Sequence, residues 1–412
     1  MITNARPQDV QRPPEWKKNY PAFRFIGGNV ISFFGDQIYL LALPLIVFAL
    51  TGSPLAMGVI AFLERLPILL QPFLGAAVDR LDRKRILLYC DAGRGITAGL
   101  IGGLFIIDQL MLWQLYGAAL VMGFFTQLYN TSQFASIPSL VREIDLERAN
   151  SVNTGLFQTA VMLGPAAGGL IVSLYHPGYA LLINSLSFFL AWMAVKTLPL
   201  IHTNIRESKQ RLWQDVKEGF VYVYQIKPIL YTNLAMMVSI FGTTLFLTML
   251  VFHLKGTVEL TASEIGVLLS VGGGAAIIGA LITAALRKRW SYQRILFTAS
   301  SFGGLSIIGF SMTSSFSGLV IMNAAGTFAA SVQSPCIVTV RQKLTPQRLL
   351  GRVQATSRLI SWVSMPAAAL LAGLIAEEFS TTYTILLGGI VATAASLFYL
   401  HPSLSRIFVR KM

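Results

Sequence analysis

The chain carries little charge for its length. Of its 412 residues only 12% are charged and 54% are hydrophobic, and the mean hydropathy is +0.64. Soluble globular domains contain roughly 25% charged residues, so this composition excludes an ordinary soluble protein. We therefore expect an integral membrane protein.

Cysteine and histidine are also scarce. Cys90 and Cys336 both fall inside long apolar stretches, and the four histidines stand near the ends of such stretches. This pattern argues against a disulfide framework and against a Cys/His metal site. The phosphate-binding pattern GxxxxGK[ST] and the hydrolase motifs HExxH and GxSxG are absent as well. We expect no enzymatic activity, no cofactor and no direct use of ATP.

Long apolar segments are abundant. A helix needs about 20 apolar residues to cross a bilayer. Segments of this kind predict an all-α integral membrane fold with twelve transmembrane helices. The predicted spans are 24–50, 54–78, 85–107, 112–136, 152–174, 178–199, 229–253, 263–286, 293–313, 317–338, 353–375 and 381–400. Ser53-Pro54 and Thr261-x-x-Glu264 are typical helix starts and support the second and eighth spans.

The basic residues all but avoid one side of this predicted topology. With alternating spans, 28 of the 32 Lys and Arg fall on the side of both termini, three lie within spans, and only Lys255 lies opposite. Because Lys and Arg are retained in cytoplasmic loops, we expect both termini in the cytoplasm. The net charge of +14 then faces anionic lipid headgroups rather than nucleic acid. The polar, Pro-rich arm 1–23 has no signal-peptide core, and 401–412 is a short tail.

An internal repeat divides the chain. RKR at 83–85 recurs as RKR at 287–289, and GPAAGGLI at 164–171 resembles MPAAALLAGLI at 365–375. This predicts two parallel six-helix bundles, 24–199 and 229–400, which is one known transporter architecture. Residues 200–228 form the cytoplasmic linker, whose LWQDVKEGFVYVY portion either lies along the membrane surface or is a solvated connection.

Two motifs connect the sequence with a known family. GAAVDRLDRKR at 75–85 matches the pattern Gly-x-x-x-Asp-Arg-x-Gly-Arg-Lys/Arg, except that Asp82 replaces the second Gly. The matching positions are Gly75, Asp79, Arg80, Arg83 and Lys84. The second motif, Gly-Pro-x-x-Gly-Gly in the fifth span, comprises Gly164, Pro165, Gly168 and Gly169.

With these motifs the chain resembles the major facilitator superfamily over nearly its full length. It is most similar to the macrolide-efflux and enterobactin-exporter type of drug/proton antiporter. The resemblance implies that the first motif is a cytoplasmic latch clasping the two bundles, with Arg358 as a partner. An inert charged loop is the alternative. It also implies that the second motif marks exporters working by antiport, although small residues also serve simple helix packing.

Ionisable residues inside predicted spans are functional candidates, because each costs about 2.5–3.5 kcal/mol to insert. Asp36 shares one face of the first span with Asn29, Ser32 and Tyr39, and Glu64 and Arg65 lie in the second span. We expect Asp36 or Glu64 to carry the coupled proton with Arg65 as counter-ion; a static ion pair is the alternative. Asp91 and Arg94, three residues apart, are expected to pair and to support the latch.

Milder polar positions are candidates for the lining of a substrate cavity, although polar residues in membrane helices more often join one helix to another. Besides the polar face of the first span, they are Gln127, Asn130, Asn233, Met236, Asn323 and Thr327. Flexible Met side chains suit varied amphipathic ligands.

The sequence therefore predicts a secondary transporter in the plasma membrane of a bacterium, a monomer that exports an amphipathic, drug-like molecule in exchange for protons by alternating access. Export of a siderophore or another endogenous metabolite and lipid flipping keep the fold but change the cargo. A non-transporting membrane sensor is a further alternative.

Overall fold

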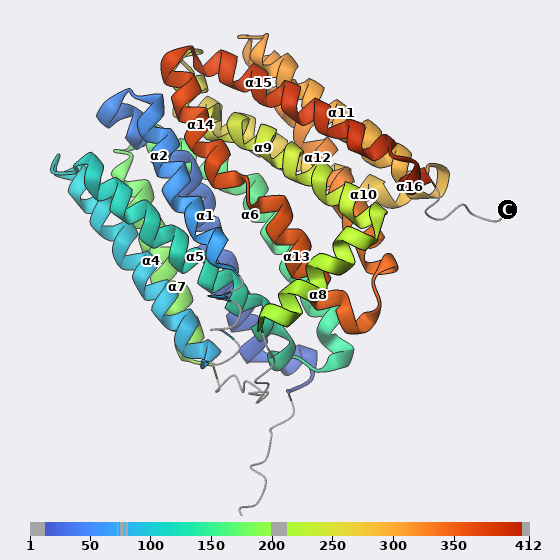
Figure 1. The fold of residues 1–412 in the computed structure, drawn as a ribbon. Helices are drawn as coiled ribbons and strands as arrows, with labels where there is room; N and C mark the ends of the chain where they lie inside the picture. Colours follow the sequence, from blue (N-terminus) through green and yellow to red (C-terminus); the bar gives the residue numbers. More distant parts are fainter. Residues whose placement is uncertain (1–12, 72, 75–77, 79–80, 199–211, 406–412) are drawn as a thin grey trace, which may run out of the picture.

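A computed structural model describes residues 13–71, 73–74, 78, 81–198 and 212–405, and within these ranges the chain is helical and contains no strand (Figure 1). Eight helices there are long and apolar enough to cross a membrane. The N-terminal helices are α1 (Tyr20–Thr51), α2 (Pro54–Arg65), η2 (Leu66–Leu70), α4 (Arg83–Ile106), α5 (Leu112–Leu140), α6 (Leu146–Leu174) and α7 (Gly178–Lys196).

The C-terminal helices follow after α8 (Leu212–Gln225). They are α9 (Lys227–Gly256), α10 (Ala262–Arg289), α11 (Tyr292–Ser311), α12 (Phe316–Leu344), α13 (Leu350–Trp362), α14 (Met365–Glu378), α15 (Thr381–Ala394), η5 (Ala395–Leu400) and α16 (Pro402–Ser405). Short 3-10 turns at Trp16–Lys18 (η1), Glu143–Asp145 (η3) and Gln347–Leu349 (η4) precede α1, α6 and α13. In Figure 1 the N-terminal helices run from blue to green and the C-terminal ones from yellow to red.

The predicted helix starts are confirmed. Ser53 accepts a hydrogen bond from the amide of Ala56, and Pro54 occupies the first turn of α2. Thr261 and Glu264 form a reciprocal capping box at the start of α10. Both arrangements satisfy amides that a helix N-terminus otherwise leaves without partners.

Three predicted spans are not single α-helices, and two of them are interrupted near a proline; the third, 381–400, passes from α15 into the 3-10 helix η5. The segment predicted at 353–375 consists of α13 and α14, with Pro366 in the first turn of α14. The segment predicted at 54–78 passes from α2 into the 3-10 helix η2, which contains Pro67. Proline lacks the amide hydrogen that continues an α-helix, which explains both interruptions.

Helix α8 packs on the C-terminal helices instead of standing free. Gly219 lies against the backbone of Arg352, and the Tyr222 hydroxyl donates a hydrogen bond of 2.6 Å to the carbonyl oxygen of Leu344. Glu218 forms an ion pair with Arg352 of α13. The described part of the linker is therefore an ordered helix fixed to α13.

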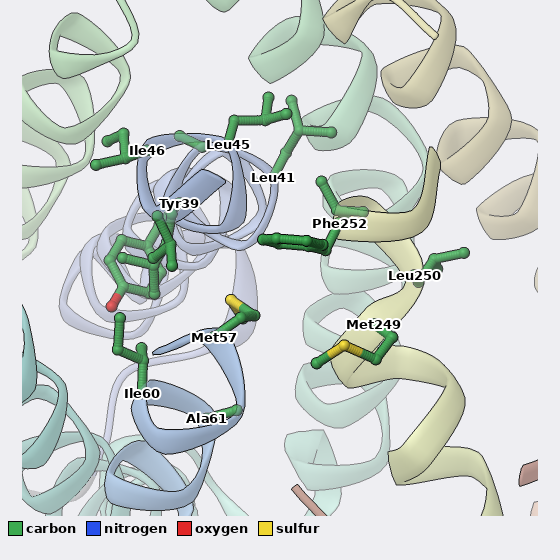
Figure 2. Packing of buried hydrophobic residues seen from close by; sticks show 14 of the residues in the cluster. Tyr39, Leu41, Leu45, Ile46, Met57, Ile60, Ala61, Met249, Leu250 and Phe252 are labelled. Carbon is green, nitrogen blue, oxygen red and sulfur yellow. The ribbon is translucent and has the colours of Figure 1, made fainter. Parts of the chain in front are cut away.

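The N- and C-terminal helices share one hydrophobic core, which we call the far-end core. It joins α1 and α2 to α9 through residues that include Met57, Ile60, Met249 and Phe252. Figure 2 shows Phe252 pointing from α9 toward α1 and α2, with Met249 facing Met57. The far-end core therefore seals the two groups of helices together near the turns that follow α1 and α9.

At the opposite end, which we call the terminal end, the buried apolar residues form separate clusters. One contains Phe25, Ile86 and Tyr129 of the N-terminal helices. Another contains Ile295 and Val340 of the C-terminal helices. No described cluster of buried apolar residues bridges the two groups there, so their hydrophobic contact is confined to the far-end core.

Glycines bring the two groups into backbone contact on both flanks of the far-end core. Gly58 of α2 lies against Gly373 of α14, where an added Cβ would stand 2.6 Å from the Gly373 Cα. Gly169 of α6 lies against Gly266 of α10, where an added Cβ would stand 3.1 Å from the Gly266 Cα. These distances leave no space for a larger residue.

We predict that Gly58→Ala lowers the apparent melting temperature of the purified protein, because its methyl group collides with the α14 backbone. Overpacking of this kind costs about 1–3 kcal/mol. Gly27→Ala is the matched control, since a Cβ at Gly27 meets no atom within 4 Å. There the higher helix propensity of Ala should leave stability unchanged or raise it. Equal losses from both substitutions would contradict the proposed backbone contact.

Candidate functional site

A cluster of charges lies inside the N-terminal helices. Arg94 of α4 donates a hydrogen bond of 2.7 Å to Asp91 and also lies 3.8 Å from a carboxylate oxygen of Asp36 in α1. The side chains of Asp91 and Arg94 are 0% and 2% exposed, whereas that of Asp36 is 26% exposed. Asp36 is therefore the accessible member of an otherwise buried triad.

Aromatic rings from two further helices hold the guanidinium in place. The Cζ of Arg94 lies 4.1 Å from the ring centre of Tyr129 in α5 and 4.3 Å from that of Phe188 in α7. The Tyr129 hydroxyl donates a hydrogen bond to the side-chain oxygen of Asn29. Desolvated cation–π contacts contribute about 2 kcal/mol, so the rings fix Arg94 strongly between the two carboxylates.

The triad carries one negative charge more than it can neutralise. Two ionised carboxylates face one guanidinium, and burial of an uncompensated charge is costly. Three polar atoms around the triad have no hydrogen-bond partner within the described residues: Nδ2 of Asn29, Oδ2 of Asp91 and Nε of Arg94. One proton on a carboxylate would make the triad neutral, and the more exposed Asp36 is the group that a proton reaches first.

Arg65, the counter-ion predicted from the sequence, is the next residue after Glu64 and does not pair with Asp36 among the described residues. Arg65 donates to the carbonyl oxygen of Ala61 at 3.2 Å and forms no ion pair with any residue that the structure describes. Arg94 pairs with Asp36 instead. The predicted Asp91–Arg94 pair is present; it lies beside Asp36, and its guanidinium contacts α1, α5 and α7.

The remaining acidic candidate, Glu64, has a different setting from Asp36. Its side chain is half-buried, its backbone carbonyl lies against Gly123 of α5, and no described cation lies within ion-pair distance. Tyr39 and Ser32, from the predicted polar face of α1, are both buried.

Three residues of the predicted latch, Gly75, Asp79 and Arg80, lie outside the described residues. Arg83 is the first residue of α4, and the Lys84 ammonium donates a hydrogen bond to the carbonyl oxygen of Leu198. Arg358 of α13 lies over the ring of Trp362 at 4.2 Å.

Asp82, the residue that departs from the family pattern, has a clear structural role. Its carboxylate accepts a hydrogen bond of 2.9 Å from the amide of Lys84 and one of 3.4 Å from the amide of Arg85. Its φ of −64° is not left-handed, so the position does not require glycine here. Asp82 caps α4, which sequence reasoning did not anticipate.

The second motif lies between α1 and α10. Gly164 and Gly168 lie against Gln37 and Ile38 of α1, while Gly169 lies against Ala262 of α10. The amide of Ala166 donates a hydrogen bond of 2.9 Å to the Ser270 hydroxyl of α10. The motif thus joins an N-terminal helix to a C-terminal one.

Three of the predicted cavity-lining residues bind neighbouring helices. Asn323 and Thr327 of α12 donate to the carbonyl oxygens of Leu268 and Gly272 in α10, at 3.2 and 2.9 Å. Asn233 of α9 donates to Ser357 of α13 at 2.9 Å. These three side chains act as interhelical links, and their hydrogen bonds leave little capacity for a ligand.

Three other members of that set are only half-buried: Met236, Gln127 and Asn130. The side-chain oxygen of Gln127 has no partner among the described residues, and the Met236 sulfur lies 3.6 Å from the Arg341 guanidinium. They remain candidates for contact with a ligand.

Comparison with known proteins identifies the family. The model of the major facilitator family described as transmembrane secretion effector matches residues 19–408. The chain belongs to this family. It is therefore a multi-pass membrane protein of a bacterial transporter class, and its family consists of transporters rather than enzymes.

Two curated relatives span most of the chain. Macrolide efflux protein A of Streptococcus pyogenes is 24% identical over 395 residues, covering 92% of this chain and 95% of that protein. The multidrug efflux pump Tap of Mycolicibacterium fortuitum is 24% identical over 366 residues, covering 85% and 88%. Both are efflux proteins of similar length.

A solved structure shares the fold. A bacterial homologue of the iron transporter ferroportin, in an inward-facing state, superimposes with a TM-score of 0.73 at 15% identity, covering 94% of this chain and 99% of that one. The helical arrangement is therefore that of a known transporter.

We predict that Asp82→Ala destabilises the protein by about 0.5–2 kcal/mol, because two amides at the start of α4 lose their acceptor. Asp82→Ser, which can still accept these hydrogen bonds, should retain most of the stability. The apparent melting temperatures of the two purified variants provide the measurement. A Ser variant as unstable as the Ala variant would show that the cap is not the cause.

Proposed function

We propose that the protein is a proton-coupled exporter of amphipathic small molecules that works by alternating access, with Asp36 as the proton-carrying residue. The observation that carries this proposal is the pairing of two carboxylates with one buried guanidinium. The efflux relatives support the direction of transport, and the triad supports the choice of coupling ion.

The coupling mechanism follows from charge balance. With Asp36 ionised, the triad holds a net negative charge in a poorly solvated site; with Asp36 protonated, Asp91 alone neutralises Arg94. Gain or loss of this proton changes the attraction between Asp36 of α1 and Arg94 of α4. A proton that arrives from outside and leaves to the cytoplasm can therefore bias the arrangement of these helices.

Alternating access is supported by the unequal contacts between the two groups of helices. We propose that residues 24–199 and 229–400 move as two six-helix bundles, within a set of twelve spans whose termini both face the cytoplasm. The far-end core then closes the outer side, and the separate clusters at the terminal end leave the inner side free to open. This arrangement corresponds to an inward-facing state.

We predict that Asp36→Asn abolishes export driven by a proton gradient, since an amide cannot exchange the proton. The measurement is uptake of a fluorescent amphipathic dye that the wild type transports into inverted proteoliposomes with an imposed pH gradient. Energy-independent equilibration of the same compound should persist, because the helices can still rearrange. Normal gradient-driven transport by Asp36→Asn would refute the assignment.

Two further variants in the same transport assay test whether loss of coupling is specific to Asp36. Asp108→Asn alters an exposed carboxylate in the turn after α4 and should leave transport unchanged. Glu64→Gln removes the other acidic candidate, and we expect it to lower transport less than Asp36→Asn, because Glu64 has no described ion partner. If only Glu64→Gln abolished coupling, the proton would have to be assigned to α2.

We also propose that Asp79 and the basic residues following it form a cytoplasmic latch in the outward-facing state, with Arg358 as a partner. The proposal rests on the sequence motif. Asp79→Asn should slow turnover several-fold without weakening ligand binding at equilibrium, as rates from vesicle transport and affinities from binding assays can show. Unchanged turnover would leave the loop with a purely topological role.

A further inference from the structure

Arg341 is a buried cation without a carboxylate partner. Located near the end of α12, it is 7% exposed and donates to the side-chain oxygens of Gln354 in α13 and Asn233 in α9, at 3.1 and 2.9 Å. Its Nε has no hydrogen-bond partner within the described chain. Neutral amides solvate the guanidinium but do not balance its charge.

A second such cation stands one helical turn from Gln354. Arg358 of α13 is half-buried, its Nε is also without a described partner, and its guanidinium lies over the Trp362 ring at 4.2 Å. Residues four apart on a helix share one face, so Gln354, Arg358 and Trp362 form a continuous strip. Arg341 contacts the end of this strip through Gln354.

Helices α12 and α13, which carry Arg341 and Arg358, contain no acidic residue. From residue 227 to the C-terminus the acids are Glu259, Glu264, Glu377 and Glu378. They stand in the turn before α10, in its first turn, or at the end of α14, all at the far end. Glu218 of α8 is already paired with Arg352. Asp79, proposed above as the partner of Arg358 in the outward-facing state, lies outside the described residues. Among the described residues the two arginines at the terminal end have no carboxylate partner, so an anion from elsewhere can neutralise them.

We infer that Arg341 and Arg358 form a binding site for the oxyanion of the cargo, a carboxylate attached to an apolar or aromatic body. A guanidinium is a fork of donors that matches a carboxylate, and each of the two has an unused Nε–H. The Trp362 ring and the Met236 sulfur, 3.6 Å from Arg341, supply apolar surface beside it. The inference rests on the proposed export function and adds the charge of the cargo.

The site complements the triad in the other bundle. The N-terminal helices hold an excess carboxylate that suits a proton, whereas the C-terminal helices hold excess guanidinium that suits an anion. Arg358 is partly exposed, so an anion can reach its guanidinium.

The first test uses benzoate as an aryl carboxylate probe and benzamide as its neutral counterpart. Benzoate should raise the apparent melting temperature of the purified protein in a neutral detergent, with saturation, and benzamide should not. Arg341→Gln and Arg358→Gln should each weaken the apparent affinity for benzoate about tenfold or more. Arg294→Gln, an exposed arginine on α11, should respond like the wild type. Equal effects of benzoate and benzamide, or an unchanged response in both arginine variants, would overturn the site.

A second variant tests the charge deficit without any ligand. Gln354→Glu places a carboxylate at the position that already contacts Arg341, at 3.1 Å. The variant should melt at a higher temperature than the wild type and lose its response to benzoate, because the site is internally filled. A melting temperature equal to or below that of the wild type would show that Arg341 does not lack an anion.

Lipid headgroups also carry oxyanions. Assays in lipid vesicles distinguish binding of a lipid headgroup from binding of the cargo anion. The benzoate response should persist in phosphatidylcholine vesicles that also contain phosphatidylglycerol. An Arg341-dependent stabilisation by phosphatidylglycerol that removes the benzoate response would assign the site to lipid. Asp36→Asn should keep the benzoate response, because this equilibrium assay uses no gradient. Failure of proton coupling and failure of the anion site can therefore be told apart.

Discussion

The packing of the N-terminal helices around the triad depends on the ion pairs that Arg94 makes with two carboxylates. A guanidinium buried at 2% exposure needs an anion, and Asp91 on the same helix already provides one at 2.7 Å. The second carboxylate, Asp36, comes from α1 and turns a local pair into a link between helices. Tyr129 and Phe188 then have to cover Arg94, which sets the packing of α5 and α7 against α4.

The two groups of helices differ in the sign of their buried charges. Buried carboxylates lie on the N-terminal side, and buried guanidinium groups without carboxylates lie on the C-terminal side. The repeat within the sequence shows the same asymmetry, since RKR occurs in both halves but only the first copy is preceded by acids. The two sequence repeats therefore differ in their charged residues.

Hydropathy and helix-start signals located the long helices of the described residues, because both depend on local sequence. The breaks near Pro67 and Pro366 were not predicted from the sequence. Asp36 and the Asp91–Arg94 pair could also be recognised, since a charge in an apolar segment stands out. Their association could not, because it depends on how α1 crosses α4. Asn233, Asn323 and Thr327 read like cavity residues for the same reason: sequence shows polarity but not which helix a side chain faces.

The seal at the far end is almost entirely apolar, and this has a thermal consequence. Met57, Met249 and Phe252 are buried together, and separating them exposes apolar surface to water, with the heat-capacity change that accompanies apolar hydration. Hydrophobic association weakens on cooling. In the proposed transport cycle, the balance between closed and open outer sides would therefore depend on temperature as well as on protons, and cold would favour release of the far-end core.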